Sequence, residues 1–501
     1  MPVRQPLLAK FLFLLVFTMA LTRPLQPRAD CSYWVAPPPE GGDENSGTFS
    51  RPWATMEHAA ESVADNFCTV WFKDGLYTTA NSLTQRYATP ITFRAVHPYQ
   101  AFLRRDNTVL ELDGVRNMTF EGFVMSHSGP GAGKHVAIMD RSSEAWSENV
   151  IFRNNIFHDS FNNDLLKIHN GVRNVTVQGN LFYNQGPADQ HMDVNSVTDI
   201  AIQDNIFFND FPGSGRTIDF DTKHFIVIKD SNEGDDGLFG SQRIAVRRNI
   251  FLNWQGEDAT FVQIGNDGKP YYEANDVQVA NNLMIGNSPF EMTAAFGVRG
   301  AKDITFSNNT VVGDLPAKSY AFWVSVTEQN PPNENIIFVN NIWSDPTGTM
   351  GVDLQGGPGE FSDGSPADTN NVLLRNNLYW NDNEPIPDGE LVSPLVDDPL
   401  HVVANPLLTE NQGGLVLPRW NGNAFLSGNL TIRQEFVRLV QQYGAIPPSS
   451  PAVDRALPQY APYEDILGRR RTGAPDLGAY EYTPQAQPGD YRLFLSVLGN
   501  E

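Results

Sequence analysis

The sequence predicts an all-β protein folded as a solenoid of parallel coils, and three observations support this prediction. Nine segments between residues 115 and 382 repeat one pattern, a short strand followed by asparagine and a second short apolar strand. Within each segment apolar and polar residues alternate, which is typical of strands with one buried face. Of the 44 asparagines, 33 fall between Asn149 and Asn383. Because one unit is too short to bury its apolar face alone, we expect successive coils to stack around a shared core.

One asparagine aligns at the same place in each coil. The aligned residues are Asn155, Asn180, Asn205, Asn249, Asn282, Asn309, Asn341 and Asn377. We expect each to lie at a tight bend, because asparagine tolerates a left-handed backbone and can hydrogen bond to the copies above and below. The first two spacings are 25 residues and the third is 44. The extra residues, within 211–240, predict a loop on one side of the solenoid that helps to form a binding face.

The first residues have the features of an export signal. Arg4 and Lys10 precede a largely apolar run over residues 11–21, which is too short to span a bilayer but suits the core of a signal peptide. We therefore expect a signal peptide over residues 1–29 and a secreted or cell-surface protein; an N-terminal membrane anchor is the alternative. No later stretch is apolar for long enough to predict a further membrane span.

The chain has two cysteines, Cys31 and Cys68. In an exported protein an even pair of cysteines indicates a disulfide, and two buried thiols are the alternative.

The charge balance excludes one class of partner. The formal net charge is -23, from 35 Lys and Arg against 58 Asp and Glu. A nucleic-acid partner is excluded on this ground, because there is no basic excess to replace the counterions of the phosphates. We expect a monomer whose partner is a polysaccharide.

The coils and two flanking segments resemble the right-handed parallel β-helix superfamily, the architecture of pectate lyases. The opening segment reads YWVAPPPEGGDENSGTFSRPWATMEHAAESVADNFCTVWFKDGLY (33–77), and the closing segment SPAVDRALPQYAPYEDILGRRRTGAPDLGAYEY (450–482) is similar to choice-of-anchor Q proteins. The resemblance implies one right-handed parallel β-helix over 78–400, an N-terminal helix cap over 30–77, a mixed C-terminal cap over 401–482 and a tail over 483–501. It implies a fold rather than one activity, since lyases, hydrolases and non-enzymatic proteins share this architecture.

One outer face of the coils is predicted to be polar. The strands VAIMDR, DLLKIHN, HMDVNS, FIVIKDS, FVQIGND and FGVRGAK can be aligned with their aliphatic residues pointing inward, so that the intervening residues point outward. These outward residues are Asp140, Arg141, Lys167, His169, His191, Asp193, Asn195, Lys229, Gln263 and Arg299. Since parallel strands lie about 4.8 Å apart, Lys167 and Asp193 become close partners. We interpret the face as a groove for a polymer; a polar surface with ordinary ion pairs is the alternative.

Elimination from a uronate is our first hypothesis for the chemistry of this groove. The reaction removes a proton next to a carboxylate, so it needs a base of lowered pKa and a cation or donor for that carboxylate. Lys167 or Lys229 is the expected base and Arg216 the expected carboxylate ligand. Substrate-binding residues are His169, His191, Asn195 and Arg299, and the Ca²⁺ ligands are Asp189, Asp193, Asp219 and Asp221. Calcium would also allow an acidic protein to hold a polyanion.

Three other interpretations remain open. Asp235 and Asp236 resemble the paired aspartates of polygalacturonase-type β-helices and would serve a glycoside hydrolase, although the Gly-His-Gly and Arg-Ile-Lys segments of that group are missing and a solvated turn or calcium loop is the alternative. His169, His191 and Asp193 could form a zinc site. A non-catalytic carbohydrate-binding or surface scaffold protein also fits the sequence.

Overall fold

The computed structural model describes residues 31–217, 222–256, 259–288, 290, 292–313, 320–352, 359–410 and 412–484. The predicted signal peptide over 1–29, the tail from residue 485 onward, and the candidate ligands Asp219 and Asp221 lie outside these residues.

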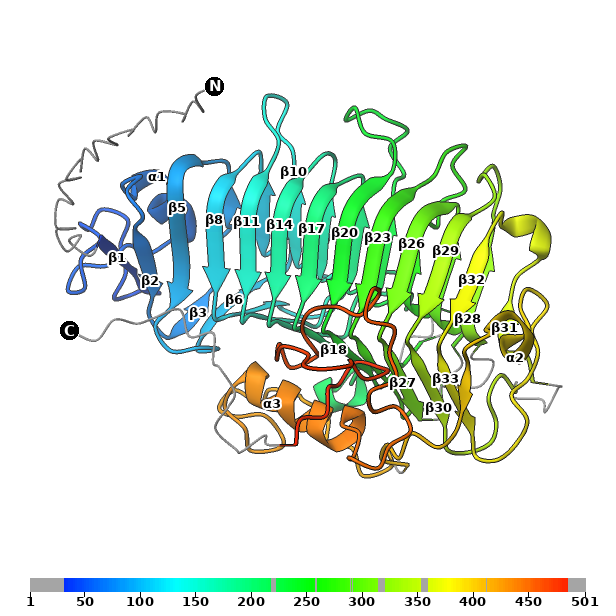
Figure 1. The fold of residues 1–501 in the computed structure, drawn as a ribbon. Helices are drawn as coiled ribbons and strands as arrows, with labels where there is room; N and C mark the ends of the chain where they lie inside the picture. The colour runs from blue at the N-terminus through cyan, green and yellow to red at the C-terminus, as the bar shows by residue number, and fades with distance from the viewer. Residues whose placement is uncertain are drawn as a thin grey trace, which may run out of the picture.

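The described chain forms a parallel β-helix in which successive coils contribute strands to three sheets (Figure 1). The twelve-stranded sheet that faces the viewer in Figure 1 is called the front sheet. Its strands, in spatial order, are β1 (Ser32–Val35), β2 (Thr69–Phe72), β5 (Arg86–Ala95), β8 (Arg116–Glu121), β11 (Glu148–Arg153), β14 (Arg173–Gln178), β17 (Thr198–Gln203), β20 (Ser241–Arg247), β23 (Ala274–Ala280), β26 (Ala301–Ser307), β29 (Glu334–Val339) and β32 (Val372–Arg375).

The second sheet has ten strands and is called the polar sheet, because it carries the predicted polar face. Its strands, in spatial order, are β31 (Ser362–Asp363), β28 (Tyr320–Ser325), β25 (Ala294–Arg299), β22 (Thr260–Ile264), β19 (Ile226–Lys229), β16 (Met192–Asn195), β13 (Leu166–His169), β10 (Ala137–Asp140), β7 (Leu110–Asp113) and β4 (Ser82–Leu83).

The third sheet has twelve strands and is called the covered sheet, because the C-terminal segment packs on its outer side. Its strands, in spatial order, are β3 (Gly75–Tyr77), β6 (Ala101–Arg105), β9 (Phe123–His127), β12 (Ile156–His158), β15 (Leu181–Tyr183), β18 (Ile206–Phe208), β21 (Ile250–Leu252), β24 (Leu283–Gly286), β27 (Thr310–Gly313), β30 (Ile342–Asp345), β33 (Leu378–Asn381) and β34 (Val402–Val403).

Helices are few and short in the described chain. They are α1 (Met56–Ser62), α2 (Pro394–Asp397), α3 (Ile432–Leu439), the 3₁₀ turns η1 (Pro212–Ser214) and η2 (Pro366–Asp368), and the π-helical turn η3 (Val440–Gly444). Among the described residues no helix has the length and apolar character needed to cross a membrane.

Stacked apolar side chains fill the interior of the coils. The repeated Ile-Phe and Leu-Phe pairs place Phe157, Phe182, Phe207 and Phe251 one above another, with ring centroids 4.8 to 5.1 Å apart. All four rings are fully buried. Because strand pairing is parallel and in register, the same residue of each unit occupies the same place in the core.

The predicted asparagine ladder is confirmed. From Asn155 to Asn341, each aligned asparagine donates its backbone N–H and its Nδ2 to the Oδ1 of the next, at 2.8 to 3.1 Å. Asn377 donates in the same way to Asp398 Oδ2, at 2.8 and 2.9 Å. A carboxylate, which accepts hydrogen bonds and donates none, thus ends the ladder.

The expectation that these asparagines take the left-handed bend is wrong, because the preceding residue does so. Asn154, Asn281, Asn308, Asn340 and Asn376 have φ between 52° and 58°. The first residue of each pair turns the chain, which leaves the side chain of the second free to enter the ladder. In each Asn-Asn pair, the first asparagine therefore makes the turn and the second forms the ladder.

The C-terminal segment lies along the side of the solenoid (orange to red in Figure 1). Helix α3 begins with a capping box between Thr431 and Gln434. Its apolar side packs on the covered sheet in a second hydrophobic core, whose C-terminal members include Trp420, Phe425, Ile432, Phe436, Leu439 and Tyr443. The mixed C-terminal cap that we expected therefore covers a side of the solenoid and is not confined to its end.

The turning asparagines of the later coils also hold this segment. Asn308 Nδ2 donates to Asp476 O at 3.0 Å, Asn340 Nδ2 to Leu457 O at 3.1 Å, and Asn376 Nδ2 to Arg455 O at 2.8 Å. These contacts fix the C-terminal segment against the bend between the front and covered sheets.

The predicted disulfide between Cys31 and Cys68 is confirmed. It joins the residues that immediately precede β1 and β2, which are neighbours in the front sheet. The predicted helix in this region is α1, which buries Met56, Ala59 and Ala60.

Asn249→Ala should destabilise the protein strongly. The substitution removes the shared acceptor of the Asn205 backbone N–H and Asn205 Nδ2, inside the core. Leaving two buried donors unpaired costs about 2 to 5 kcal/mol. Asn275→Ala, in the partly exposed part of the front sheet, is the matched control and should change stability by less than about 1 kcal/mol. Urea denaturation of both variants tests this, and equal midpoints would show that the ladder does not stabilise the coils.

Candidate functional site

Strand register places the predicted polar residues in two rows on the outer face of the polar sheet. The first row runs through Glu111, Ile138, Lys167, Asp193, Val227, Gln263, Gly297 and Trp323. The second row includes Asp113, Asp140, His169, Asn195, Lys229, Arg299 and Ser325. The alignment inferred from the alternation of the sequence is therefore confirmed for these residues.

The two lysines of these rows are both paired with carboxylates. Lys167 Nζ lies 2.7 Å from Asp193 Oδ2, and Lys229 Nζ lies 3.1 Å from Asp267 Oδ2. The Asp193 side chain is only 4% exposed, whereas that of Lys167 is 20% exposed. The expected Lys167–Asp193 pair is thus present, with the carboxylate buried beneath the ammonium group.

Further polar contacts extend the second row. His169 Nε2 lies 3.1 Å from Asp140 Oδ2, and Asn195 Nδ2 donates to Ser231 Oγ at 2.6 Å. Both residues lie where the sequence placed them, on the outer face beside the lysines.

Three aspartates gather around the lysines, and one of them was missed in the sequence. Asp189 precedes β16 and Asp164 precedes β13 in the preceding coil. Burial raises the pKa of Asp189 to about 7, and the charge of Asp164 adds to the rise. Burial also acts to raise the pKa of Asp193, but Lys229 and Lys167 outweigh it and lower that pKa. Asp164, only three residues before Lys167 in DLLKIHN, could have been found from this proximity.

The pKa values of the lysines differ from our expectation. Burial acts to lower the pKa of Lys167, but Asp193 and Asp164 outweigh it and the pKa is raised. For Lys229 burial is likewise outweighed, by Asp193 and Asp267, and the pKa is raised. The lowered pKa expected of a base is therefore wrong for this form of the protein. Asp193 is the largest favourable charge for both lysines, so whatever neutralises it lowers both pKa values.

The donor chemistry of the cluster fits a hard cation such as Ca²⁺. Asp164 Oδ2 and Asp193 Oδ1 are buried and take part in no hydrogen bond, although His135 Nδ1 lies 3.4 Å from the former. Buried carboxylate oxygens without partners are costly unless a cation or donor satisfies them. Within the described ranges no three His, Cys, Asp or Glu side chains already converge as metal ligands. Asp164, Asp189 and Asp193 would have to turn toward a shared ion.

Comparisons with known proteins place the fold. No protein-family model matches the chain, and the search of curated proteins found no relative. The structure is similar to that of pectate lyase Pel9A, with a TM-score of 0.51 and 14% identity over 91% of this chain and 100% of that one. It is also similar to the GH136 lacto-N-biosidase from Eubacterium ramulus, with a TM-score of 0.52 and 11% identity over 75% of this chain and 68% of that one.

The fold is a right-handed parallel β-helix. This confirms the fold class predicted from the coils. At such low identity the likeness concerns the fold and assigns no residue of the site.

His191 and Arg216 do not belong to the outer face. His191 precedes β16 at a bend, where alternation fails, and its buried ring stacks on Phe225 with centroids 4.3 Å apart. Its Nε2 lies 2.9 Å from Asn209 Oδ1. The expectation that His191 contacts substrate is wrong for this reason, and the zinc hypothesis loses its central ligand.

Arg216 joins loops at the bend between the covered and polar sheets. Its Nη1 donates to Asn184 O at 3.0 Å and its Nη2 to Gln185 O at 3.2 Å. The guanidinium also lies 4.5 Å from the Phe161 ring centroid and 4.8 Å from that of Phe211. These contacts give Arg216 a structural role in place of the expected role in carboxylate binding.

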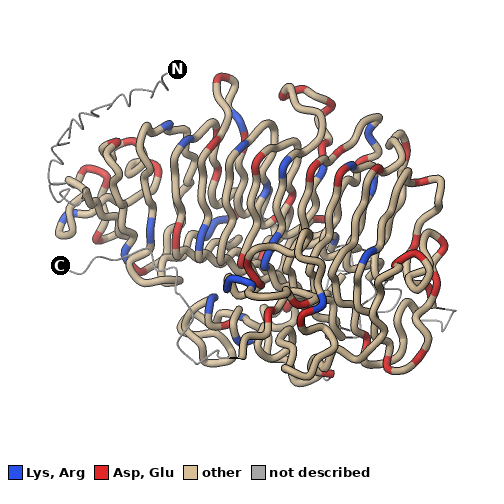
Figure 2. Tube along the Cα trace, viewed as in Figure 1, with Lys and Arg blue, Asp and Glu red and all other residues tan. Residues whose placement is uncertain are grey.

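The Asp235–Asp236 pair lies in a loop between β19 and β20, and Figure 2 shows acidic residues on the loops that lead into the front sheet. Asp236 is buried and accepts hydrogen bonds from Asn232 Nδ2 at 2.7 Å and Leu238 N at 2.9 Å. Asp235 is exposed, and its carbonyl accepts from Arg141 Nη2 at 3.0 Å. One carboxylate shapes the turn and the other faces solvent, so the two do not form a pair across a substrate.

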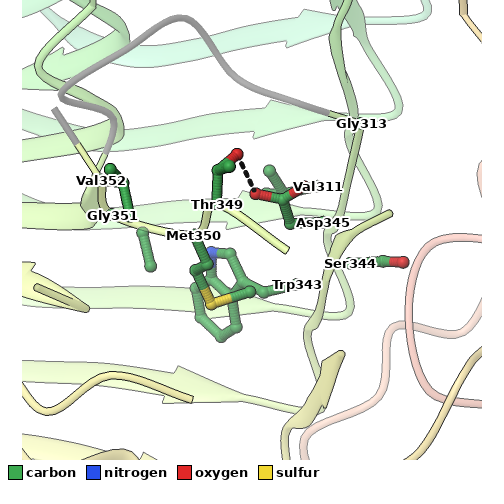
Figure 3. A pocket seen from close by; sticks show the side chains of 10 residues that line it. Val311, Gly313, Trp343, Ser344, Asp345, Thr349, Met350, Gly351 and Val352 are labelled. Carbon is green, nitrogen blue, oxygen red and sulfur yellow. Dashed lines mark hydrogen bonds between the residues drawn. The ribbon is translucent and has the colours of Figure 1, made fainter. Parts of the chain in front are cut away.

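A separate pocket near β27 and β30 lacks the groups for such chemistry. Trp343, Asp345, Thr349 and Met350 are among its lining residues (Figure 3). Asp345 accepts hydrogen bonds from Thr347 and Thr349 and is the only titratable side chain among the lining residues. The polar sheet remains the better candidate site, because it combines carboxylates with two partly exposed lysines on one face.

Asp189→Asn should raise the melting temperature at pH 8 and leave it unchanged near pH 4. The folded-state pKa of Asp189, about 7, lies above its reference value of 3.8. Ionisation is therefore harder in the folded state, and stability falls as the pH rises from about 4 to about 7. The amide removes that loss. Thermal melts across this range measure the effect, with Asp276→Asn in the exposed part of the front sheet as the control. A variant that melts below the wild type at pH 8 would contradict the shift.

Proposed function

We propose that this protein is an exported polysaccharide lyase that cleaves a uronate-containing polymer on the outer face of the polar sheet. The observation that carries the proposal is the cluster of Asp164, Asp189 and Asp193 with Lys167 and Lys229 on three successive coils. The resemblance of the fold to a pectate lyase supports it. The Cys31–Cys68 disulfide supports export, since such bonds persist in oxidising compartments. We also propose that the protein is a monomer.

Calcium is the cation that this proposal assigns to the cluster. Asp164, Asp189 and Asp193 would hold it, and Asp219 and Asp221 are further candidates outside the described residues. Bound there, it would neutralise the carboxylate of the substrate and make the neighbouring proton more acidic.

The chain's own residues would then carry out the proton transfer. An uncharged Lys167 or Lys229 takes the proton next to the substrate carboxylate, a double bond forms in the sugar, the glycosidic C–O bond breaks, and the departing oxygen takes a proton from water. The pKa values of both lysines are raised while Asp193 is an anion that no bound cation neutralises. A cation bound at Asp193 would lower the pKa of both lysines. Filling the site would therefore produce the uncharged lysine that acts as the base. His169 and Asn195 lie on the adjacent row, where they can donate hydrogen bonds to sugar hydroxyl groups or accept hydrogen bonds from them.

Hydrolysis of a glycosidic bond is the second candidate, and one observation favours it. Asp189 has a pKa of about 7 while the pKa of the nearby Asp193 is lowered. Two carboxyl groups with such separated pKa values suit a general acid and an anionic base or nucleophile. The resemblance of the fold to a lacto-N-biosidase is in keeping with this alternative.

Lys167→Ala and Lys229→Ala test the assignment of the base. Loss of the base should lower kcat on a polyuronate by about 100-fold or more, and loss of the other lysine should act mainly on KM. The matched control is Lys302→Ala, in an exposed ion pair with Glu334 on the front sheet, which should leave the rate unchanged. The rate is followed by the ultraviolet absorbance of the unsaturated product. If both lysine variants keep the wild-type rate, neither is the base.

The products and their calcium dependence distinguish the candidate functions. We expect unsaturated products from unesterified polyuronates and a loss of activity with a chelator that added Ca²⁺ restores. Reducing ends without the ultraviolet absorbance would establish hydrolysis instead. Binding without any new reducing ends would identify a non-catalytic carbohydrate-binding or scaffold protein.

A further inference from the structure

Arg299, the last residue of β25, is a partly buried cation without a carboxylate partner. Its guanidinium carbon lies 4.1 Å from the Trp323 ring centroid, and its Nε donates to Ser325 Oγ at 3.3 Å. No Asp or Glu within the described ranges forms an ion pair with it; Glu273 acts on it only at longer range. Burial lowers the pKa of Arg299, and Glu273 only partly offsets this. A half-buried cation of this kind gains most from an anionic ligand.

The coil between Lys229 and Arg299 carries a glycine at the position that matches these two residues. Ile228, Ile264 and Val298 pair across three successive strands. Lys229, Gly265 and Arg299 follow them and so occupy the same place in consecutive coils. Gly265 has φ 74°, and a Cβ there would lie 1.7 Å from the Arg299 carbonyl oxygen, so no side chain fits. The two cations are therefore two strands apart, about 10 Å, with no side chain at the matching position between them.

Three cations lie near the buried ring of His224. The pKa of His224 is lowered to about 3 by burial and then by Arg299, Lys229 and Lys223, in that order. Three cations therefore act on one buried ring, in a chain whose formal net charge is -23. These cations would offset part of the repulsion between a polyanion and the acidic chain.

From these three observations we infer that Arg299, held against Trp323, is a binding site for a second carboxylate of the substrate, about two sugar residues from the bond that is cleaved. The polymer then lies along the solenoid axis, from the aspartate cluster toward the C-terminal coils. The guanidinium offers two parallel N–H donors to a carboxylate, and Trp323 fixes the plane in which they point. The inference rests on the proposed function for the position of cleavage, and it specifies the substrate as a polyuronate with at least two free carboxylates.

The test compares an unesterified oligouronate of six residues with its fully methyl-esterified form. Binding of both is measured by calorimetry in a background without turnover, which is the inactive lysine variant, or the wild type if it does not cleave the polymer. Arg299→Ala should weaken binding of the acidic oligomer by about 10- to 100-fold and leave the ester unchanged, because only the acid offers the ion pair. Arg299→Lys should recover part of the loss, since it keeps the charge without the planar pair of donors. Arg375→Ala, a partly buried arginine of the front sheet, is the matched control and should bind both oligomers as the background does.

The outcomes separate this inference from the proposed function. If Arg299→Ala weakens the acid and the ester equally, or weakens neither, the carboxylate site is refuted whether or not the protein is a lyase. If the acid alone is weakened while no turnover is found in the wild type, the carboxylate site stands and the lyase proposal fails. In an active enzyme the same variant should raise KM for the acidic polymer while kcat stays within about threefold, since Arg299 does not touch the reacting atoms.

Discussion

The buried amide ladder fixes the register of the coils, and every other feature of the molecule depends on that register. Each aligned asparagine from Asn180 onward presents its amide oxygen to two donors of the preceding coil. A coil shifted by one residue would leave those donors unpaired in an apolar interior, at a cost of several kcal/mol per coil. The bends are therefore held at one place, and each following strand starts at the same level. Lys167 and Asp193 face each other because their coils are aligned at the ladder.

On the polar face the two lysines are paired with carboxylates, whereas some other charged groups of the described residues are not paired. Lys167 and Lys229 are each held by a carboxylate, and this keeps both ammonium groups charged. Burial, and then the nearby charge of Asp164, raises the pKa of Asp189 to about 7. On the same face Arg299 forms no ion pair with a carboxylate of the described residues, and Glu273 acts on it only at longer range. A bound cation would complement the aspartate cluster, and a carboxylate of the ligand would complement Arg299.

Much of the fold could be predicted from the sequence, because its signals are periodic. The repeated asparagines predicted the coils and the ladder. The alternation of apolar and polar residues predicted the outer position of Lys167, His169, Asp193, Asn195 and Lys229. His191 was misplaced because alternation holds within a strand and fails at the bend that precedes it. The raised pKa values of the lysines could not be foreseen, since they depend on distances to Asp193 and Asp267.

Features outside the repeat were harder to predict. Asp398 ends the ladder, yet it is an aspartate in a segment without the repeated pattern. The resemblance implied a mixed C-terminal cap over 401–482, and did not show that α3 in this segment packs on the covered sheet. Where only one copy of a contact exists, the sequence offers no second copy against which to recognise it.

The ladder also has a direction, with consequences for how such a molecule changes over evolution. Every rung donates toward the C-terminal coils, and Asp398, the final acceptor, comes from outside the repeating units. The hydrogen bonds at the two ends of the ladder do not depend on the number of asparagines between them. Duplication or deletion of a whole coil therefore leaves these end hydrogen bonds intact. The strands β13, β16 and β19 are one exception, because a coil inserted among them would separate Lys167, Asp193 and Lys229. The later coils are another, because Asn308, Asn340 and Asn376 hold the C-terminal segment at fixed spacing. The number of coils can therefore change only where such contacts are kept.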